Sequence, residues 1–588
     1  MAILKPSSAS VGSEVSKELA VVLAQRGSLA RIVALVANER LLHIVYKPTE
    51  KLYYISPLIS SSSPERAKRE RFILSGMPPF LTLEVDVDGN LVQDLMHESN
   101  VLIEWDADLT ATFAERICCS ARYLADACAE NRPCPTREDT DYITWGQSIV
   151  EANGHPLHKS RMSVDPRTQQ SSSFDLKRTE ITFMAVKRHI LEARGPLKAE
   201  LAPLLAVTGI DGAASAVDSS EIAIPVPKFQ IKFLLSRPRS KSNLRLLPYE
   251  VPALAQVSTH SLTVPSLPGL GVKVALSLVI GDTPRILKTS LAYNAIRYWE
   301  GGLLDPKNFV GLRTPLEILP DVAYATGMGD HLGVMIRYDP YHSSRPLVDK
   351  DVAYAMTGGL REPAVIGKGG CAAESVFELT RPNRYVKLYF KCFFHPLFSN
   401  SLLIDGHGQS AVLRFSRSSG RLLGFSACDM SDACFNRSHL EATTGIRLEA
   451  RMDNHHLEAP DFMDRAFFIF FIAQLLPLIV ALGLHRYKSA SFTALELFAG
   501  TAADKEAAGL VGGNGWAAVA HEVHEVHEAL ARYEAVQGDS AVAVASRELA
   551  DAARKIWFAP TWPLQCFVSQ RMRANWAHRD KSLQTNKN

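Results

Sequence analysis

The sequence predicts a mixed α/β (α+β) protein with mostly antiparallel sheets and a helical C-terminal part. The chain has 588 residues, of which 47% are hydrophobic and 21% charged, and this is the composition of a globular protein with several cores. Residues 222–288 carry strand patterns that Pro and Gly interrupt, which is typical of antiparallel sheets. From about residue 460 onward, the pattern is mainly helical.

The other elements follow from local periodicity. Apolar residues at helical spacing predict three helices in the first 200 residues, over 14–36, 110–128 and about 180–192. Residues 41–58 have the pattern of strands and loops. A Gly-containing polar turn leads into an apolar strand over 404–413, and Ser418-Ser419-Gly420 then predicts a hairpin.

One apolar segment allows two interpretations. Residues 467–484 form an uncharged run near the lower length limit for spanning a bilayer. Gln474 and Pro477 interrupt this run, and a buried helix in a large core has the same pattern. Because the rest of the chain is average in polarity, we predict a core helix and no membrane partner. A membrane-anchored enzyme is the alternative.

The net charge and the cysteine pattern argue against a nucleic-acid-binding protein and against a secreted one. The chain has 64 basic and 62 acidic residues, a formal net charge of +2. Nucleic-acid-binding proteins usually concentrate basic side chains in a stripe, so no nucleic acid partner is expected. The nine cysteines form no CxxC pair, and Met1-Ala2-Ile3-Leu4-Lys5-Pro6 lacks the apolar stretch of a secretory signal. We expect reduced thiols and a cytoplasmic location.

Two stretches are similar to common site motifs but lack a residue that the motif requires. The run from His521 to His527 is not HExxH, because Glu525 stands where the second His should be, and a solvated helix face is the preferred interpretation over a metal site. Gly367-Lys368-Gly369 is not a phosphate-binding P-loop, because no Ser or Thr follows the Lys.

The most informative stretch is 404–410, Ile-Asp-Gly-His-Gly-Gln-Ser. Glycine lets a backbone approach a ligand closely, so Asp405, His407 and Gln409 can converge on a phosphate or a metal. Asp405 and Asp429 offer oxygens of the kind that Mg²⁺ accepts, with phosphates and waters completing its shell. We therefore predict a Mg²⁺ site at these two acids.

Fixed cations and hydroxyls lie upstream of this turn. Lys273 and Arg285 are twelve residues apart, so in one regular strand both would face the same side. This holds only if the strand continues past Gly281-Asp282, where a bend is expected. Ser258 and Ser261 offer hydroxyls to phosphate oxygens. When ATP is used to join a carboxylate to an amine or alcohol, the carboxylate and ATP are both anionic, and their charge must be neutralised before they react. Fixed cations and hydroxyls suit this task.

In this order and approximate spacing, the motifs resemble those of the IucA/IucC family of siderophore synthetases, which work independently of non-ribosomal peptide synthetases. That family carries GHPxHPxxKxR, IPVHPWQ, SxRT, a KLSL-type strand ending in Arg, and an acid-x-HGQN turn followed by an Asp. The counterparts here are Gly154–Arg161, Ile224–Gln230, Ser258–Ser261, Lys273–Arg285, and Asp405–Ser410 with Asp429. The resemblance covers about residues 150–430.

The resemblance implies a three-lobed fold of thumb (1–140), fingers (141–345) and palm (346–588), with the active site between fingers and palm. It implies an enzyme that uses ATP and Mg²⁺ to adenylate a carboxyl group of citrate or a related polycarboxylic acid. An amine, amino acid or hydroxyl nucleophile then gives an amide or ester, in the biosynthesis of a siderophore or another citrate-derived metabolite. A catalytically silent relative that binds a nucleotide or polycarboxylate as a regulatory partner is the alternative. A homodimer is compatible with both.

Site residues follow from the same resemblance. Lys273, Arg285 and His407 form the catalytic set, with Arg285 and His407 at the substrate carboxylates and the adenylate. The residues expected at the nucleotide are His155, Lys159, Arg161, Ser258, His260, Ser261, Lys273, Gln409 and Ser410. Asp405 and Asp429 are expected at the metal.

The chain departs from the family pattern at several positions. His260 replaces an Arg, so a titratable ring stands where a permanently charged fork is expected. Ser410 replaces an Asn, Asp405 replaces a Glu, and Cys428 stands where an Arg usually precedes the Asp. The first loop is three residues short, and Pro227-Lys228-Phe229 replaces His-Pro-Trp. These departures indicate a distant member whose substrate does not follow from the resemblance.

Overall fold

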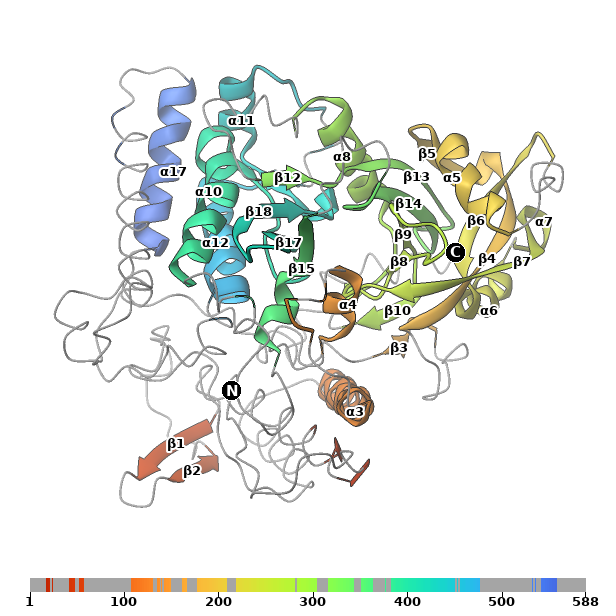
Figure 1. Cartoon of the computed structure of the whole chain (residues 1–588), viewed down its shortest axis with the longest axis horizontal. Coiled ribbons are helices and arrows are strands. Elements are labelled where there is room, and N and C mark those ends of the chain that lie inside the picture. Colours follow the sequence, from red (N-terminus) through yellow and green to blue (C-terminus); the bar gives the residue numbers. More distant parts are fainter. Residues whose placement is uncertain are drawn as a thin grey trace.

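The computed structural model describes most of residues 107–475, together with two strands at 42–57 and a helix at 541–557. The longest gaps inside the main range lie at 150–160, 166–176, 209–217, 304–315, 343–350 and 363–375. Two sheets dominate this part of the chain and stand next to each other in Figure 1. The predicted mixed α/β fold with mostly antiparallel sheets is confirmed.

The larger sheet has eight strands, and every neighbouring pair is antiparallel. Its strands, in spatial order, are β5 (Leu191–Arg194), β13 (Asp321–Gly327), β14 (Leu332–Tyr338), β9 (Leu270–Val274), β8 (Ser261–Thr263), β7 (Leu244–Ala255), β4 (Arg178–Lys187) and β6 (Glu221–Pro227). Three short helices lie beside the larger sheet in Figure 1, and they are α5 (Leu197–Ala206), α6 (Ile231–Ser236) and α7 (Ser240–Asn243).

The helix predicted over 180–192 is wrong, because β4 occupies residues 178–187. Its residues 181–186, Ile-Thr-Phe-Met-Ala-Val, are all buried, since β4 lies between β6 and β7 in the interior of the sheet. A strand that is covered on both faces loses its alternation, so its apolar run cannot be told from a helix by periodicity. The β-branched and aromatic residues fit the strand.

The smaller sheet has four strands, β12 (Leu316–Ile318), β18 (Leu422–Ala427), β17 (Ala411–Ser416) and β15 (Val352–Met356). Only β12 and β18 run parallel. The predicted hairpin is confirmed, because β17 and β18 pair around a turn in which Gly420 has a φ of +65°. Since β12 joins this sheet, a segment before residue 345 belongs with the later part of the chain. The three-lobe division stays a prediction.

Helices cover the smaller sheet on the side away from the larger one (Figure 1). They are α10 (Pro382–Asn400), α11 (Arg437–Thr444), α12 (Ala459–Phe467) and α17 (Ala541–Trp557). Rings of α10 pack edge to face on β18, for example Tyr385 against Phe425 with centroids 5.2 Å apart. Such pairs add about 0.5–1.5 kcal/mol each beyond the burial of their area.

The remaining elements are short or stand apart. They are the hairpin β1 (Leu42–Lys47) and β2 (Leu52–Pro57), α3 (Ala107–Ala129), α4 (Tyr142–Gln147), β3 (Met162–Ser163), β10 (Leu278–Ile280), β11 (Thr283–Pro284), α8 (Thr289–Glu300), η6 (Thr357–Arg361), β16 (Leu402–Leu403), η7 (Met430–Asp432) and β19 (Cys434–Phe435). The helix predicted over 110–128 and the strands predicted within 41–58 are confirmed. Most of the helix predicted over 14–36 lies outside the described residues, as do the motifs at 367–369 and 521–527.

The apolar run that begins at residue 467 continues α12 as a π-helix over Phe468–Leu475 (η9). Phe467, Phe470 and Leu475 are buried, and the Gln474 side chain donates a hydrogen bond of 2.6 Å to the Tyr385 hydroxyl. The core-helix prediction is therefore confirmed as far as Leu475. Within the described residues, no helix combines the length and apolarity that a bilayer crossing requires.

Two buried histidines should make the stability depend on pH. Burial lowers the pKa of His331 and of His439 to about 4 in each case. The unfolded chain, with an ordinary histidine pKa of about 6.5, binds more protons than the folded chain between pH 6.5 and 4. The contribution of each ring is therefore constant above pH 6.5 and is lost as the pH falls, by up to about 1.4 kcal/mol per pH unit for each histidine.

Urea unfolding from pH 8 to pH 4.5 measures this slope. His439 contacts the Ser401 hydroxyl through Nδ1 and the Ser546 hydroxyl through Nε2, at 2.7 and 3.0 Å, so a Gln at 439 keeps a polar group there. In His439→Gln the fall of the unfolding free energy below pH 6.5 should become shallower. The same slope in both proteins would show that His439 does not titrate in this window.

Candidate active site

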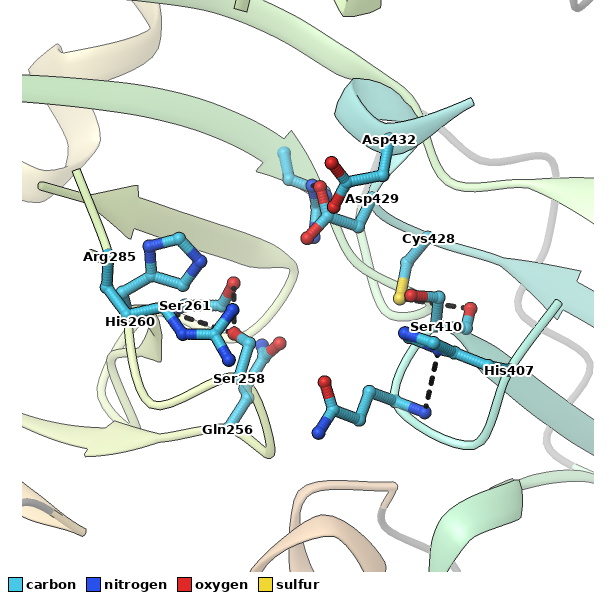
Figure 2. A pocket seen from close by; sticks show the side chains of 12 residues that line it. Gln256, Ser258, His260, Ser261, Arg285, His407, Ser410, Cys428, Asp429 and Asp432 are labelled. Atoms are coloured by element: carbon cyan, nitrogen blue, oxygen red, sulfur yellow. Dashed lines mark hydrogen bonds and ion pairs between the residues drawn. The ribbon is translucent and has the colours of Figure 1, made fainter. Parts of the chain in front are cut away.

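A pocket brings together segments from the two sheets (Figure 2). Its lining residues are Gln256, Ser258, His260, Ser261, Arg285, Arg337, His407, Gln409, Ser410, Cys428, Asp429 and Asp432. The first six come from the larger sheet and its connections, and the last six from the turns at the ends of β17 and β18. Eight of the predicted site residues thus meet in one place, although 171 positions separate Ser258 from Asp429.

The turn between β7 and β8 supplies the hydroxyls. The Thr259 N–H donates to the Gln256 carbonyl at 2.9 Å, and Thr259 has a φ of +68°. A β-branched residue rarely adopts this left-handed conformation, so the surrounding contacts hold the turn in a strained form. The Ser258 hydroxyl donates to Ser261 Oγ at 2.9 Å, and both serines line the pocket. Their role in binding phosphate stays a prediction.

Lys273, Arg337, Asp321 and Asp429 form a nearly buried set of four charges, of which Arg337 and Asp429 line the pocket. Lys273 Nζ lies 2.6 Å from Asp429 Oδ1 and donates to the Ser431 hydroxyl at 2.8 Å. Arg337 bridges two acids, with 2.8 Å from its Nε to Asp321 Oδ1 and 3.1 Å from an Nη to Asp429 Oδ1. Lys273 and Arg337 are neighbours on β9 and β14, because Arg337 pairs with Gly271, two positions before Lys273 on the same face.

This arrangement fixes the charge of Asp429. Burial alone would raise the pKa of its carboxyl, but Lys273 and Arg337 outweigh burial and hold the pKa well below its ordinary value. Asp429 has a φ of +66°, so its backbone is also in an unusual conformation. The residue is therefore a permanent anion whose Oδ1 is already shared by two cations and the Ser431 hydroxyl.

The condition under which Lys273 and Arg285 would face the same side, one strand that continues past Gly281-Asp282, is not met. β9 ends at Val274, and the chain reverses between β10 and β11 before it reaches Arg285, whose backbone pairs with Leu276 and Leu278. A bend was expected near residue 281, and it is a full hairpin. The charges of both residues still act on His260, since Lys273 and Arg285 each lower its pKa.

Arg285 is a partly exposed cation at the pocket wall, and its buried Nε has no hydrogen-bond partner. Burial lowers its pKa, and Asp432 and Asp429 oppose this shift. Arg161 lies nearby: its pKa falls to about 10 because of burial and then of repulsion by Arg285. Two adjacent arginines make this side of the pocket attractive to an anion. Of the first predicted motif only Arg161 is described, since His155 and Lys159 lie outside the described residues.

His260 is buried, and its Nδ1 has no hydrogen-bond partner. Burial, and then the charges of Lys273 and Arg285, lower its pKa well below 6.5, so the ring is neutral at neutral pH. The titratable ring that replaces an arginine therefore carries no charge here.

If the neutral ring contacts ATP, His260→Gln should keep the dissociation constant for ATP within about threefold, because one neutral hydrogen-bonding side chain replaces another. Calorimetric titration at pH 7.0 and pH 8.5 should then give the same pH dependence for both proteins. A weakening with rising pH that only the native protein shows would mean that His260 binds phosphate as a cation.

Close backbone contacts at glycines hold the turn that carries His407. The Gly358 N–H of η6 donates to the Gly408 carbonyl at 2.9 Å, and a Cβ on Gly358 would lie 2.6 Å from that oxygen. The Tyr389 hydroxyl donates to the Gly406 carbonyl at 3.0 Å. Such close approach of two backbones requires glycine, which explains the Gly-His-Gly pattern.

His407 faces Asp405, with 3.5 Å between Nε2 and Asp405 Oδ2. The Gln409 N–H donates to Nδ1 at 3.3 Å, so the proton of the neutral ring lies on Nε2, toward the acid. Asp405 is 4% exposed, its Oδ1 has no hydrogen-bond partner, and burial raises its pKa against the opposing effect of His407. An orphaned buried carboxylate oxygen beside a pocket fits a cation that arrives with a ligand.

Among the described residues, no three His, Cys, Asp or Glu side chains form a metal cluster. Mg²⁺ in nucleotide sites needs only one or two carboxylates besides phosphates and water. Asp405 fits that role through its free Oδ1, whereas Asp429 would share a metal with Lys273 and Arg337. The metal prediction for these two acids stays a prediction.

Sequence reasoning missed four contributors to this site: Gln256, Arg337, Ser431 and Asp432. Arg337 could have been recognised from the sequence, because it is the one charged residue in the apolar strand Leu-Gly-Val-Met-Ile-Arg-Tyr. A charge in a buried strand requires a partner of opposite charge. Cys428 was noted only as a departure. Its thiol donates to the Ser410 carbonyl at 3.3 Å, and burial raises its pKa to about 12, so this position is neutral.

The similarity of this chain to known proteins is distant. No protein-family model matches the chain. A curated NRPS-independent siderophore synthetase, rfs from Rhizopus delemar, is 25% identical over 464 residues, which is 69% of this chain and 68% of that protein.

Solved structures share the fold at low identity. ATP-bound aerobactin synthetase IucA from Klebsiella pneumoniae gives a TM-score of 0.60 at 14% identity, over 81% of this chain and 90% of that one. Aerobactin synthetase IucC from the same organism gives a TM-score of 0.65 at 13% identity, over 88% of this chain and 93% of that one. Petrobactin biosynthesis protein AsbB from Bacillus anthracis gives a TM-score of 0.66 at 12% identity, over 98% of this chain and 100% of that one.

Proposed function

We propose, from the premise that the chain is a distant member of the IucA/IucC family of NRPS-independent siderophore synthetases, that it is an ATP-dependent ligase acting on citrate or a related polycarboxylic acid. The observation that carries this proposal is the placing of Arg285, the Ser258–Ser261 hydroxyls and His407 around one pocket. Groups of this kind bind phosphates and carboxylates, and a carboxylate and ATP are the two substrates of an adenylation.

In the first step, a carboxylate oxygen of the acid attacks the α-phosphorus of ATP. A phosphorus–oxygen bond forms, the bond to the bridging oxygen of the β-phosphate breaks, and pyrophosphate leaves. Arg285 and the serine hydroxyls would bind the phosphate oxygens, where negative charge builds up. Fixed cations placed at developing charge need no reorganisation during the reaction, which makes them effective.

In the second step, the nucleophile attacks the acyl carbon, and the carbon–oxygen bond to AMP breaks. AMP then carries away one oxygen that came from the acid, and the nucleophile loses its proton to solvent. His407 lies on the opposite wall from Arg285 in Figure 2, so an acyl group between them would contact both side chains. Asp405, 3.5 Å from His407 Nε2, would hold the orientation of that ring.

Mg²⁺, when bound with ATP, would neutralise phosphate charge and orient the leaving pyrophosphate. Asp405 would hold it through the unpartnered Oδ1, with Asp429 as the second acid. Lys273 and Arg337 lower the pKa of Asp429, which favours the ionised form that a metal requires.

Product analysis tests the proposal. With ATP, Mg²⁺, a panel of polycarboxylic acids and a panel of amines and alcohols, the protein should release AMP and pyrophosphate only when its acid is present. Release of ADP and phosphate would indicate an acyl-phosphate route instead. ATP binding without turnover on any acid would favour a silent relative that serves as a regulatory partner.

A further inference from the structure

A buried polar network lies outside the pocket lining, where three distant parts of the chain meet. It consists of the side chains of Gln230, Ser277 and His331, which are between 2% and 9% exposed. Gln230 is the last residue of η5 (Lys228–Gln230), Ser277 directly precedes β10, and His331 directly precedes β14. None of the three residues lines the pocket, so they do not contact its ligands directly.

The Gln230 amide uses both its nitrogen and its oxygen. Its Nε2 donates to the Ser277 hydroxyl at 2.7 Å and to the His331 carbonyl at 3.1 Å, and its Oε1 accepts from the Ser277 N–H at 3.0 Å. The Ser277 Oγ lies 3.0 Å from His331 Nδ1. Burial lowers the pKa of His331 to about 4, so the ring is neutral and Nδ1 can accept the hydroxyl proton. A satisfied buried network of this kind fixes one arrangement of the backbone.

The backbone that this network fixes adjoins two arginines. Strand β10 is the central strand of a three-stranded sheet, with β3 on one side and β11 on the other. The Ser277 carbonyl accepts from the Val164 N–H at 2.9 Å, three residues after Arg161. The Leu276 N–H donates to the Arg285 carbonyl at 2.7 Å. The segment around Ser277 is therefore bonded to the chain that follows Arg161 and to Arg285 itself.

The two arginines repel each other. Burial lowers the pKa of both guanidinium groups, and the charge of Arg285 lowers the pKa of Arg161 further. Groups of like charge move apart where the backbone permits it. A rigid backbone keeps them together as a preorganised attraction for an anion. Gln230 ends the stretch Ile224–Gln230, one of the stretches singled out in the sequence, and the pocket lining gives it no role.

We propose that Gln230 is a positioning residue, which acts through Ser277 to hold Arg285 at the pocket and Arg161 beside it for the binding of an anion. This inference rests on the proposed function, in which Arg285 binds phosphate oxygens. Without the amide, the Ser277 N–H and hydroxyl lose their partner, and the segment that is bonded to both arginines loses its support. Anion binding should then weaken although both arginines are still present.

A double-mutant cycle with inorganic pyrophosphate as the probe separates positioning from a purely structural role. Calorimetric titration gives the dissociation constant for pyrophosphate in the native protein, Gln230→Leu, Arg285→Ala and the double variant. Gln230→Leu should raise this constant about tenfold, because a displaced cation loses most of its charge-assisted contact. In the Arg285→Ala background, the same change should raise it less than about twofold, since two residues that act through one contact are not additive.

A milder variant and a matched control accompany the cycle. Ser277→Ala removes the hydroxyl but keeps the bonds of Gln230 to the Ser277 N–H and the His331 carbonyl, so it should give a smaller rise that also depends on Arg285. Gln474 is a second buried glutamine, which donates to the Tyr385 hydroxyl and does not line the pocket. Gln474→Leu should lower the unfolding free energy as Gln230→Leu does, but leave the dissociation constant within about twofold of the native value.

Pyrophosphate binding requires no turnover, so this result does not depend on whether any acid is adenylated. Acid-dependent ATP–pyrophosphate exchange by the native protein tests the proposed function separately. Equal rises of the dissociation constant with and without Arg285 would assign Gln230 to the fold alone. An unchanged constant in a folded Gln230→Leu protein, or a native protein that binds no pyrophosphate, would also overturn the inference.

Discussion

Arg285→Ala should lower the rate of acid-dependent ATP–pyrophosphate exchange by about 10²-fold or more. Removal of one preorganised donor at a developing anion typically costs this much. Arg285 is partly exposed and makes no salt bridge with the acids of the pocket, so its removal leaves no buried partner unpaired. The protein should therefore stay folded, with an unfolding free energy close to that of the native chain.

Two variants sharpen this experiment. Arg285→Lys keeps the charge but loses the planar fork, and should recover only part of the rate. Arg447→Ala removes an arginine whose side chain is 87% exposed and does not line the pocket, and it should leave exchange unchanged. A loss of less than about tenfold in a folded Arg285→Ala protein would remove Arg285 from the reacting centre.

Lys273→Met should have a double effect, on stability and on activity. Lys273 and Arg337 balance Asp321 and Asp429, and Lys273 is 5% exposed. Breaking a buried charge pair by removing one partner leaves an uncompensated charge and costs about 3–5 kcal/mol. Urea unfolding should show this loss, and exchange activity should fall with it.

The double variant Lys273→Met, Asp429→Asn separates the two effects. It restores the charge balance, because Arg337 then pairs with Asp321 alone. Most of the lost stability should return, since a neutral pair in place of a buried ion pair is often tolerated. Activity should not return, because the predicted catalytic lysine and the candidate metal ligand are both gone. Recovered activity would show that the four charges serve the fold only.

The elements that the sequence predicted well are those whose faces differ in polarity. The helix over 110–128 and the β17–β18 hairpin were recognisable, since their apolar spacing and turn residues carry a period. β4 was not, because a strand buried on both faces has no alternation. The parallel partner of β18 is β12, more than 100 residues earlier, and no local pattern indicates such a pairing.

The site was predictable where a motif is contiguous. His407, Gln409 and Ser410 of the 404–410 turn line one pocket together with the serines at 258 and 261. The roles of Arg337 and Asp432 depend on which strands lie side by side, and this information is not local. His260 shows a further limit, because its type suggests a titratable cation while burial and two neighbouring cations make it neutral. Charge state follows from the tertiary environment.

Oxygen transfer from the acid tests the central claim of an acyl-adenylate most directly. With the carboxylic acid labelled with ¹⁸O in its carboxyl groups, ATP, Mg²⁺ and the co-substrate, the AMP that is released should carry one ¹⁸O atom, detected by mass spectrometry or by the ³¹P shift of its phosphate. Label in inorganic phosphate with none in AMP would show that the acid attacks the γ-phosphorus, and would contradict the account.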